Sequence, residues 1–193
     1  MIQTSGGSGR ARAARLFVAL EVPREIKIRL LALKSSFPGL KWTPAANLHL
    51  TLRFIGSVPP TRIAPVQQSL RLVRCAAFNL TLAGLGLFSR GSGGVLWAGV
   101  REEPALRKLK DLVDLALRSG VGLNAEEASF SPHLTLSRFK NLDVSEKQIQ
   151  EKSGEGFGEF TVAAFTLFRS FLRPAGAVHE PVERYPLDWG RAD

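Results

Sequence analysis

Residues 47–55 read NLHLTLRFI and residues 130–139 read FSPHLTLSRF, and these two stretches decide the fold. Both alternate apolar and polar side chains, which is the pattern of a β-strand with one buried face. In each stretch leucines occupy one face, while a histidine and a threonine two residues later share the other: His49 with Thr51, and His133 with Thr135. The two histidines are 84 residues apart, a spacing that suits two related halves of one protein rather than a short repeat.

The sequence around these stretches predicts a mixture of strands and helices. Apolar runs predict further strands, helical spacing predicts three amphipathic helices and one short polar helix, and a Gly/Ser segment predicts a hairpin turn. The expected strands are 15–22, 78–87, 95–100, 157–169 and 178–187, and the expected turn is 89–94. The first expected helix follows Pro23, and the second spans 61–75. The third begins at Pro104 and ends at Ser119-Gly120, and the fourth spans 145–152. The fold class that this order favours is α+β with a mostly antiparallel sheet.

The length of 193 residues suits one compact unit of two lobes. Residues 1–14 are rich in Gly, Ser and Arg, and we expect them to form a disordered basic tail whose arginines, with Arg15, lie near phosphates. Residues 15–193 then form a single bilobal domain. Duplicated halves usually pack around a pseudo-twofold axis, so we expect the two histidine strands to face each other across a central cleft.

Charge and cysteine content restrict the partners and the compartment. The formal net charge is +9, which favours a polyanion such as nucleic acid, although a basic surface alone does not require one. Cys75 is the single cysteine, so it forms no intrachain disulfide, and it lies in an apolar helical stretch typical of a core residue. No apolar run approaches the length of a membrane span. We therefore expect a cytoplasmic protein, and a monomer.

Paired histidines and threonines suit acid–base chemistry at phosphorus. A lone histidine on a strand is more often structural, but the duplicated pattern favours a site. Because imidazole titrates near neutral pH, one ring can accept a proton from water while the other protonates a leaving oxygen. Thr51 and Thr135 can donate hydrogen bonds to phosphate oxygens. Simple alternation places Arg53 on the same face as His49, where it is a candidate to bind the phosphate with its positive charge, or else a solvated residue at the end of the strand.

NLHLTLRFIG and SPHLTLSRF resemble the paired His-x-Thr signatures of the two-histidine (2H) phosphoesterases, and specifically the bacterial RNA 2′,3′-cyclic phosphodiesterase and 2′-5′ RNA ligase branch. RLFVALEVP, GLGLFSRGSGGVLWAGV and FTLFRSFLRPAGAVHEPVERYPL resemble the family's opening strand, central hairpin and closing strands. The resemblance implies a bilobal fold of two pseudo-symmetric lobes with helices packed outside and one motif from each lobe in the cleft. It also implies that a cyclic phosphate at an RNA 3′ end opens to a 2′-phosphate.

The resemblance assigns roles to individual residues. His49 matches the proton donor and His133 the proton acceptor. Arg138 matches a phosphate-contacting arginine, although simple alternation turns it toward the leucine face unless a bulge re-aims it. Phe54 can stack on a base, as can Trp42 and Trp97, although these aromatic residues are more often core. His179 stands where relatives often have Tyr, and we interpret it as a structural residue in a loop or strand start.

Other chemistries fit the sequence less well. A zinc site needs three or four convergent ligands, which the two motifs do not supply, and Gly84-Leu85-Gly86 lacks the rest of a phosphate-binding loop. We therefore expect no metal and no cofactor. Three alternatives stay open: a 2′-5′ ligase of cleaved RNA (tRNA) halves, a non-catalytic RNA-binding module, and a phosphodiesterase for small cyclic nucleotides.

Overall fold

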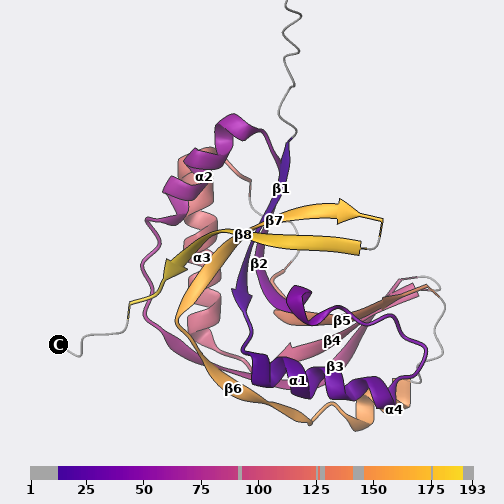
Figure 1. The fold of residues 1–193 in the computed structure, drawn as a ribbon. Helices are drawn as coiled ribbons and strands as arrows, with labels where there is room; N and C mark the ends of the chain where they lie inside the picture. Colours follow the sequence, from indigo (N-terminus) through magenta and orange to yellow (C-terminus); the bar gives the residue numbers. More distant parts are fainter. Residues whose placement is uncertain are drawn as a thin grey trace, which may run out of the picture.

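The computed structural model describes residues 13–90, 93–124, 126, 129–140, 146–174 and 176–188 (Figure 1). Its strands are β1 (Ala14–Glu21), β2 (His49–Val58), β3 (Phe78–Arg90), β4 (Gly93–Val100), β5 (His133–Phe139), β6 (Gly156–Val162), β7 (Ala164–Arg173) and β8 (Gly176–Pro186). Its α-helices are α1 (Arg24–Ala32), α2 (Ile63–Leu70), α3 (Pro104–Val121) and α4 (Glu146–Glu151), with short 3-10 helices at Leu33–Ser36, Ala45–Asn47 and Pro60–Arg62. Nearly all of the expected basic tail lies outside the described residues. Among those residues, no helix has both the length and the apolar character needed to cross a bilayer.

The described strands form one curled sheet in the order β6-β3-β4-β5-β2-β1-β7-β8, and every neighbouring pair is antiparallel. The middle of the sheet is its narrowest junction, because β2 and β5 are paired only at Leu50 and Leu134. Four strands lie on each side of that junction. The expected α+β class with two antiparallel lobes is therefore confirmed.

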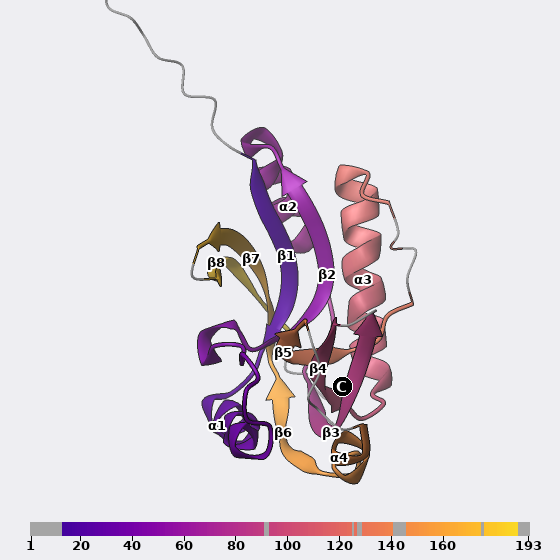
Figure 2. The same cartoon turned by 90° about the vertical axis from the view of Figure 1, so that its right-hand side faces the viewer.

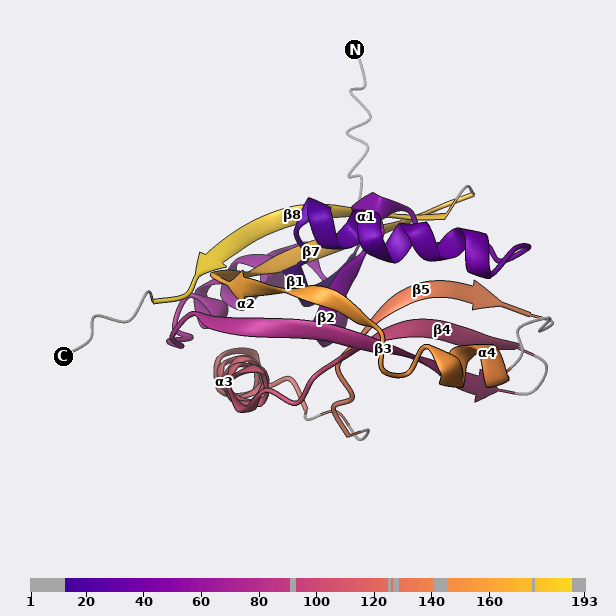
Figure 3. The same cartoon turned by 90° about the horizontal axis from the view of Figure 1, so that it is seen from below.

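Each lobe contains the same strand–helix–strand unit. In one lobe β1 leads through α1 to β2, and in the other β4 leads through α3 to β5, with the two strands of each unit paired. The helices then cross over: α1 contacts β6, and α3 contacts β2. Figure 2 shows α3 lying beside β2, and Figure 3 shows α1 and α3 on opposite sides of β3 and β6. This exchange ties the two lobes together where the sheet itself is narrow.

The leucine rows predicted for the two histidine strands are buried. Leu50, Leu52, Leu134 and Leu136 are each at most 1% exposed and belong to the main apolar core. Fully burying a leucine side chain contributes roughly 1.5–3 kcal/mol, so these rows fix which face of each strand turns outward. Cys75 is also buried, as expected.

Element boundaries differ from the sequence predictions at several places, and three of these differences have a physical explanation. The helix expected over 61–75 is a 3-10 turn followed by α2, which ends at Leu70, because the chain then turns so that Ala76 forms a bridge with Asp188. The strand expected over 157–169 is two strands, since β6 pairs with β3 whereas β7 pairs with β1. The helix expected to end at Ser119-Gly120 continues to Val121 and is capped by Gly122, whose φ of 67° lies in the left-handed region that glycine adopts readily.

Candidate active site

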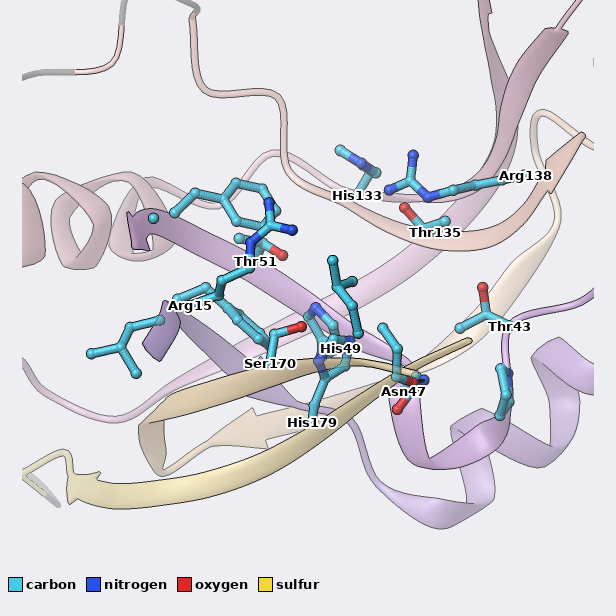
Figure 4. Close-up of a pocket in the computed structure, with 17 residues that line it drawn as sticks. Arg15, Thr43, Asn47, His49, Thr51, His133, Thr135, Arg138, Ser170 and His179 are labelled. Atoms are coloured by element: carbon cyan, nitrogen blue, oxygen red, sulfur yellow. Dashed lines mark hydrogen bonds between the residues drawn. The ribbon is translucent and has the colours of Figure 1, made fainter. Parts of the chain in front are cut away.

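The structure brings the two His-x-Thr pairs into one pocket. His49, Thr51, His133 and Thr135 are half-buried and line a cavity of about 700 Å³, a size typical of small-ligand sites. Figure 4 shows His133 and Thr135 across this cavity from His49. The pocket is completed by Leu16, Phe17, Thr43, Pro44, Asn47, Gly56, Ser170, Leu172 and Ala177, together with Arg15, Phe54, Arg138 and His179.

A bulge follows each His-x-Thr pair and changes which side chains reach the pocket. The pairing of β1 with β2 skips Leu52, and the pairing of β4 with β5 skips Leu136. Two consecutive residues on each strand are therefore buried, and the next residue turns outward. That next residue is Phe54 on β2 and Arg138 on β5, and both line the pocket.

The prediction that Arg53 shares a face with His49 is wrong. The bulge at Leu52 turns Arg53 to the buried side, where it is 4% exposed and lies within 3.5 Å of carboxylates of Asp114 and Glu126. Arg53 is not among the residues that line the pocket. The bulge on β5 has the opposite effect. Simple alternation would bury Arg138, and the bulge instead turns it into the cavity.

The orientation of His133 leaves one ring nitrogen for proton transfer. Its Nδ1 lies 2.8 Å from the carbonyl oxygen of Ser131. A carbonyl can only accept a hydrogen bond, so Nδ1 carries the proton and donates it. In the neutral ring the lone pair is then on Nε2. The rings of Phe88 and Trp97, with centroids 5.0 and 6.3 Å away, pack around the imidazole.

His49 lies in a more buried environment than an ordinary surface imidazole. Its ring centroid is 4.9 Å from that of Phe17 and 5.2 Å from that of His179. Burial lowers the pKa of His49 from 6.5 to about 4, with smaller lowering by the positive charges of His179, Lys27 and His133, while the backbone of Asn47 opposes the shift. This pKa favours the neutral imidazole at pH 7.

His179 is a pocket residue that the sequence interpretation missed. It lies near the start of β8, the second of the two places that the sequence suggested, opposite Ser170, and its ring stands edge-on to that of His49 with an interplanar angle of 85°. Its Nδ1 is buried without a hydrogen-bond partner among the described residues, and burial lowers its pKa. No local pattern marks this residue, because only the order β2-β1-β7-β8 brings β8 to the site.

The pocket suits an anion. Arg15 and Arg138 contribute positive charge, and none of the described residues that line the cavity is acidic. Phe54 is 62% exposed at the pocket, so its ring is free to contact a ligand. Trp42 and Trp97 are instead partly buried and do not line the cavity. Within the part of the chain that the structure describes, no cluster of three or more His, Cys, Asp or Glu side chains is arranged to hold a metal ion.

Comparison with known proteins identifies the class that this fold and site define. A family model described as LigT-like phosphoesterase matches residues 20–97. The RNA 2′,3′-cyclic phosphodiesterase of Archaeoglobus fulgidus is 34% identical over 171 residues, which cover 86% of this chain and 96% of the relative. The chain therefore belongs to the LigT-like phosphoesterases of the two-histidine superfamily.

Other relatives agree with this membership. The RNA 2′,3′-cyclic phosphodiesterase of Escherichia coli is 32% identical over 90% of this chain and 96% of its own length. The crystal structure of Escherichia coli LigT complexed with 3′-AMP matches with a TM-score of 0.78 and 29% identity, over 91% of this chain and 98% of LigT. A Thermus thermophilus structure matches with a TM-score of 0.75 and 30% identity, over 92% and 99% of the two chains.

Proposed function

We propose that this chain is a hydrolase that opens the 2′,3′-cyclic phosphate at the end of an RNA to a 2′-phosphomonoester, without a metal ion. The observation that carries the proposal is that His49 and His133, which are 84 residues apart in the sequence and lie on different strands, line the same pocket. Its substrate class follows the relatives, which are named RNA 2′,3′-cyclic phosphodiesterase. Solved structures of Escherichia coli LigT with phosphate and with 3′-AMP support a site for phosphate and nucleotides.

The proposed reaction is an in-line displacement at phosphorus. Nε2 of His133 takes a proton from water, whose oxygen forms a new bond to the phosphorus. The bond between phosphorus and the 3′ oxygen breaks, and His49 gives its proton to that leaving oxygen. The product carries a 2′-phosphate and a 3′-hydroxyl, and each proton transfer contributes about 10²- to 10⁴-fold in rate.

Neighbouring side chains stabilise the charge that develops on the phosphate. The hydroxyls of Thr51 and Thr135 donate to the non-bridging oxygens, one from each strand, and Arg138 adds a positive charge at the same side of the cavity as His133 (Figure 4). Phe54 offers a face for the base of the terminal nucleotide. Arg53 has no part in this proposal, because it lies outside the pocket.

The proton on His49 depends on the substrate. In the free protein the low pKa leaves few molecules with a protonated His49 at pH 7. An anionic phosphate between the rings favours the imidazolium and raises that pKa. The substrate thus promotes the protonation of the group that has to act as the acid.

The test is hydrolysis of an oligonucleotide ending in 2′,3′-cyclic phosphate, measured in excess chelator. The proposal predicts turnover by the native protein and a loss of at least about 10²-fold in both His49→Ala and His133→Ala. Ser35→Ala is the control, because Ser35 is exposed and lies outside the pocket. Full activity in either histidine variant, or tight RNA binding without turnover, contradicts the proposal.

Two further arms separate the alternatives. Supplying a 5′-hydroxyl RNA together with the cyclic end and seeking a 2′,5′ junction tests the ligase direction. Comparing oligonucleotide with mononucleotide substrates tests whether a small cyclic nucleotide is preferred. The cytoplasmic location and the monomeric state expected from the sequence stay predictions.

A further inference from the structure

Arg53 on β2 and Ser137 on β5 are buried polar residues at equivalent places. Each directly follows the bulge of its strand, and they are 4% and 0% exposed. Both turn away from the pocket that the histidines line. Since a buried polar group is stable only when it is bonded, the partners of these two residues indicate what they do.

Arg53 contacts the segment that leads into β5. Its guanidinium donates a hydrogen bond to the carbonyl of Asn124, and its Nη1 lies 3.4 Å from a carboxylate oxygen of Glu126. Lys110 on α3 lies 3.1 Å from the same carboxylate, with its Nζ 5.7 Å from the centre of the Phe130 ring. With Asp114, this cluster contains two positive and two negative side chains, so its charges cancel.

That segment ends at His133. After Phe130 comes Ser131, whose carbonyl accepts the Nδ1 hydrogen bond of His133 at 2.8 Å. Because this bond sets which nitrogen of His133 faces the pocket, the position of the segment determines the orientation of the ring. Arg53, on the strand of His49, therefore contacts the same connection into β5 that carries the carbonyl of Ser131.

Ser137 makes the reciprocal contact. Its hydroxyl donates to the carbonyl of Lys41 at 3.0 Å, and the amide of Thr43 donates to the carbonyl of Leu136 at 2.7 Å. These bonds fix residues 41–43, which lead through the 3-10 helix at 45–47 to β2. The last residue of that helix, Asn47, precedes His49 by two residues, so the position of residues 41–47 sets where His49 enters β2.

We propose that Arg53 and Ser137 are crossed positioning residues: each histidine strand, through the residue after its bulge, fixes the segment whose backbone orients the histidine of the other strand. The geometry of the two rings is then set jointly by both lobes. What the rings do rests on the proposed function, but the crossed positioning itself does not require any activity.

The experiment records ¹⁵N and ¹H NMR spectra of the three imidazoles in the full chain without substrate. The variants are Ser137→Ala on β5 and Glu126→Gln in the Arg53 cluster. Glu126 is chosen because Arg53 is only 4% exposed, so that removing its large side chain from the core risks unfolding. The matched controls are Ser35→Ala, which removes another serine-to-carbonyl bond, and Glu155→Gln, which weakens the exposed ion pair with Lys152.

Each variant is expected to perturb the histidine that lies on the opposite strand. Ser137→Ala shifts the ring resonances of His49 and speeds exchange of its ring N–H roughly tenfold, while those of His133 stay in place. Glu126→Gln shifts the ring resonances of His133 and speeds exchange of its ring N–H, while the resonances of His49 stay in place. Neither control shifts the resonances of either ring. In the hydrolysis assay each variant lowers kcat about tenfold with little change in KM, because ring orientation rather than binding is impaired.

Three outcomes overturn the proposal: a variant that perturbs the histidine of its own strand, a variant that perturbs neither ring, and equal perturbation of both rings in every variant. Crossed NMR effects in a protein that does not hydrolyse cyclic phosphate contradict only the proposed function. Uncrossed effects in an active enzyme contradict only the crossed positioning.

Discussion

Arg138 occupies on β5 the position that Phe54 occupies on β2. Each is the first residue to turn outward after a bulge that directly follows a His-x-Thr pair, and each lines the pocket. The two lobes thus place different chemistry at one equivalent position, a cation on the His133 side and an aromatic ring on the His49 side. This difference leads to separate predictions for the two residues.

Replacing Arg138 should impair the chemical step. We expect Arg138→Gln to lower kcat/KM for the cyclic-phosphate oligonucleotide by about 10²-fold, because a charge-assisted bond to the phosphate is lost where negative charge develops. Steady-state kinetics provide the measurement. The matched control is Arg107→Gln, which removes an exposed arginine of α3 outside the pocket. Equal losses in both variants would point to a general effect of net charge instead.

Replacing Phe54 should impair binding rather than chemistry. We expect Phe54→Ala to raise KM by about 5- to 100-fold with kcat nearly unchanged, since stacking of a base on an aromatic ring contributes roughly 1–3 kcal/mol. Phe54→Tyr keeps the ring and should retain the native KM. A fall in kcat with an unaltered KM would contradict a stacking role.

The two threonines should contribute similarly. We expect Thr51→Val and Thr135→Val each to lower kcat about 10- to 10³-fold, because each removes one donor to a non-bridging oxygen while keeping the side-chain volume. Thr161→Val is the control, as the Thr161 hydroxyl bonds to Asn79 on the sheet outside the pocket. Native kcat in either pocket variant would remove that threonine from the proposed mechanism.

The titration of His49 should respond to an anion. We expect an NMR midpoint near pH 4 in the free protein, following the pKa of about 4, and a higher midpoint when inorganic phosphate is added. His179→Phe should also raise the midpoint of the free protein, because it removes the positive charge that contributes to the shift. A midpoint near 6.5 in the free native protein would contradict the buried environment described for His49.

Stability should fall in acid for the same reason. The pKa of His49 is lower in the folded protein than in the unfolded chain, so the unfolded chain binds more protons between about pH 6.5 and pH 4. The stabilisation is present above pH 6.5 and is lost as the pH falls toward 4, by up to about 3 kcal/mol. Urea unfolding at pH 7 and pH 4.5 should show a smaller difference for His49→Phe than for the native chain. Ser35→Ala should retain the native difference, and an unchanged difference in His49→Phe would contradict the prediction.

Sequence alone could predict the features that depend on local alternation. The strands around His49 and His133, their buried leucine rows and the lobe duplication all follow from side chains two residues apart on a pleated strand. Alternation alone places Arg53 on the wrong face, because a bulge adds one residue and a sequence does not mark where the partner strand skips one. The sequence likewise does not show where the bulge that turns Arg138 into the pocket occurs.

The order of the strands in the sheet accounts for the other features that could not be predicted from the sequence. His179 reaches His49 only because β7 pairs with β1 and carries β8 with it, so no pattern near His179 could reveal the contact. The break at Ala163 has the same origin, since the two halves of that apolar run pair with different strands. Local propensity is alike on both sides of the break, and only tertiary pairing separates them.

The most direct test of the account is a crystal structure of the chain with a nucleoside 2′-phosphate, the proposed product. The account predicts a phosphate group held between the two strands, within hydrogen-bond distance of Nε2 of His133 and of the ring of His49. A phosphate that lies within hydrogen-bond distance of only one imidazole, or of neither, would contradict it.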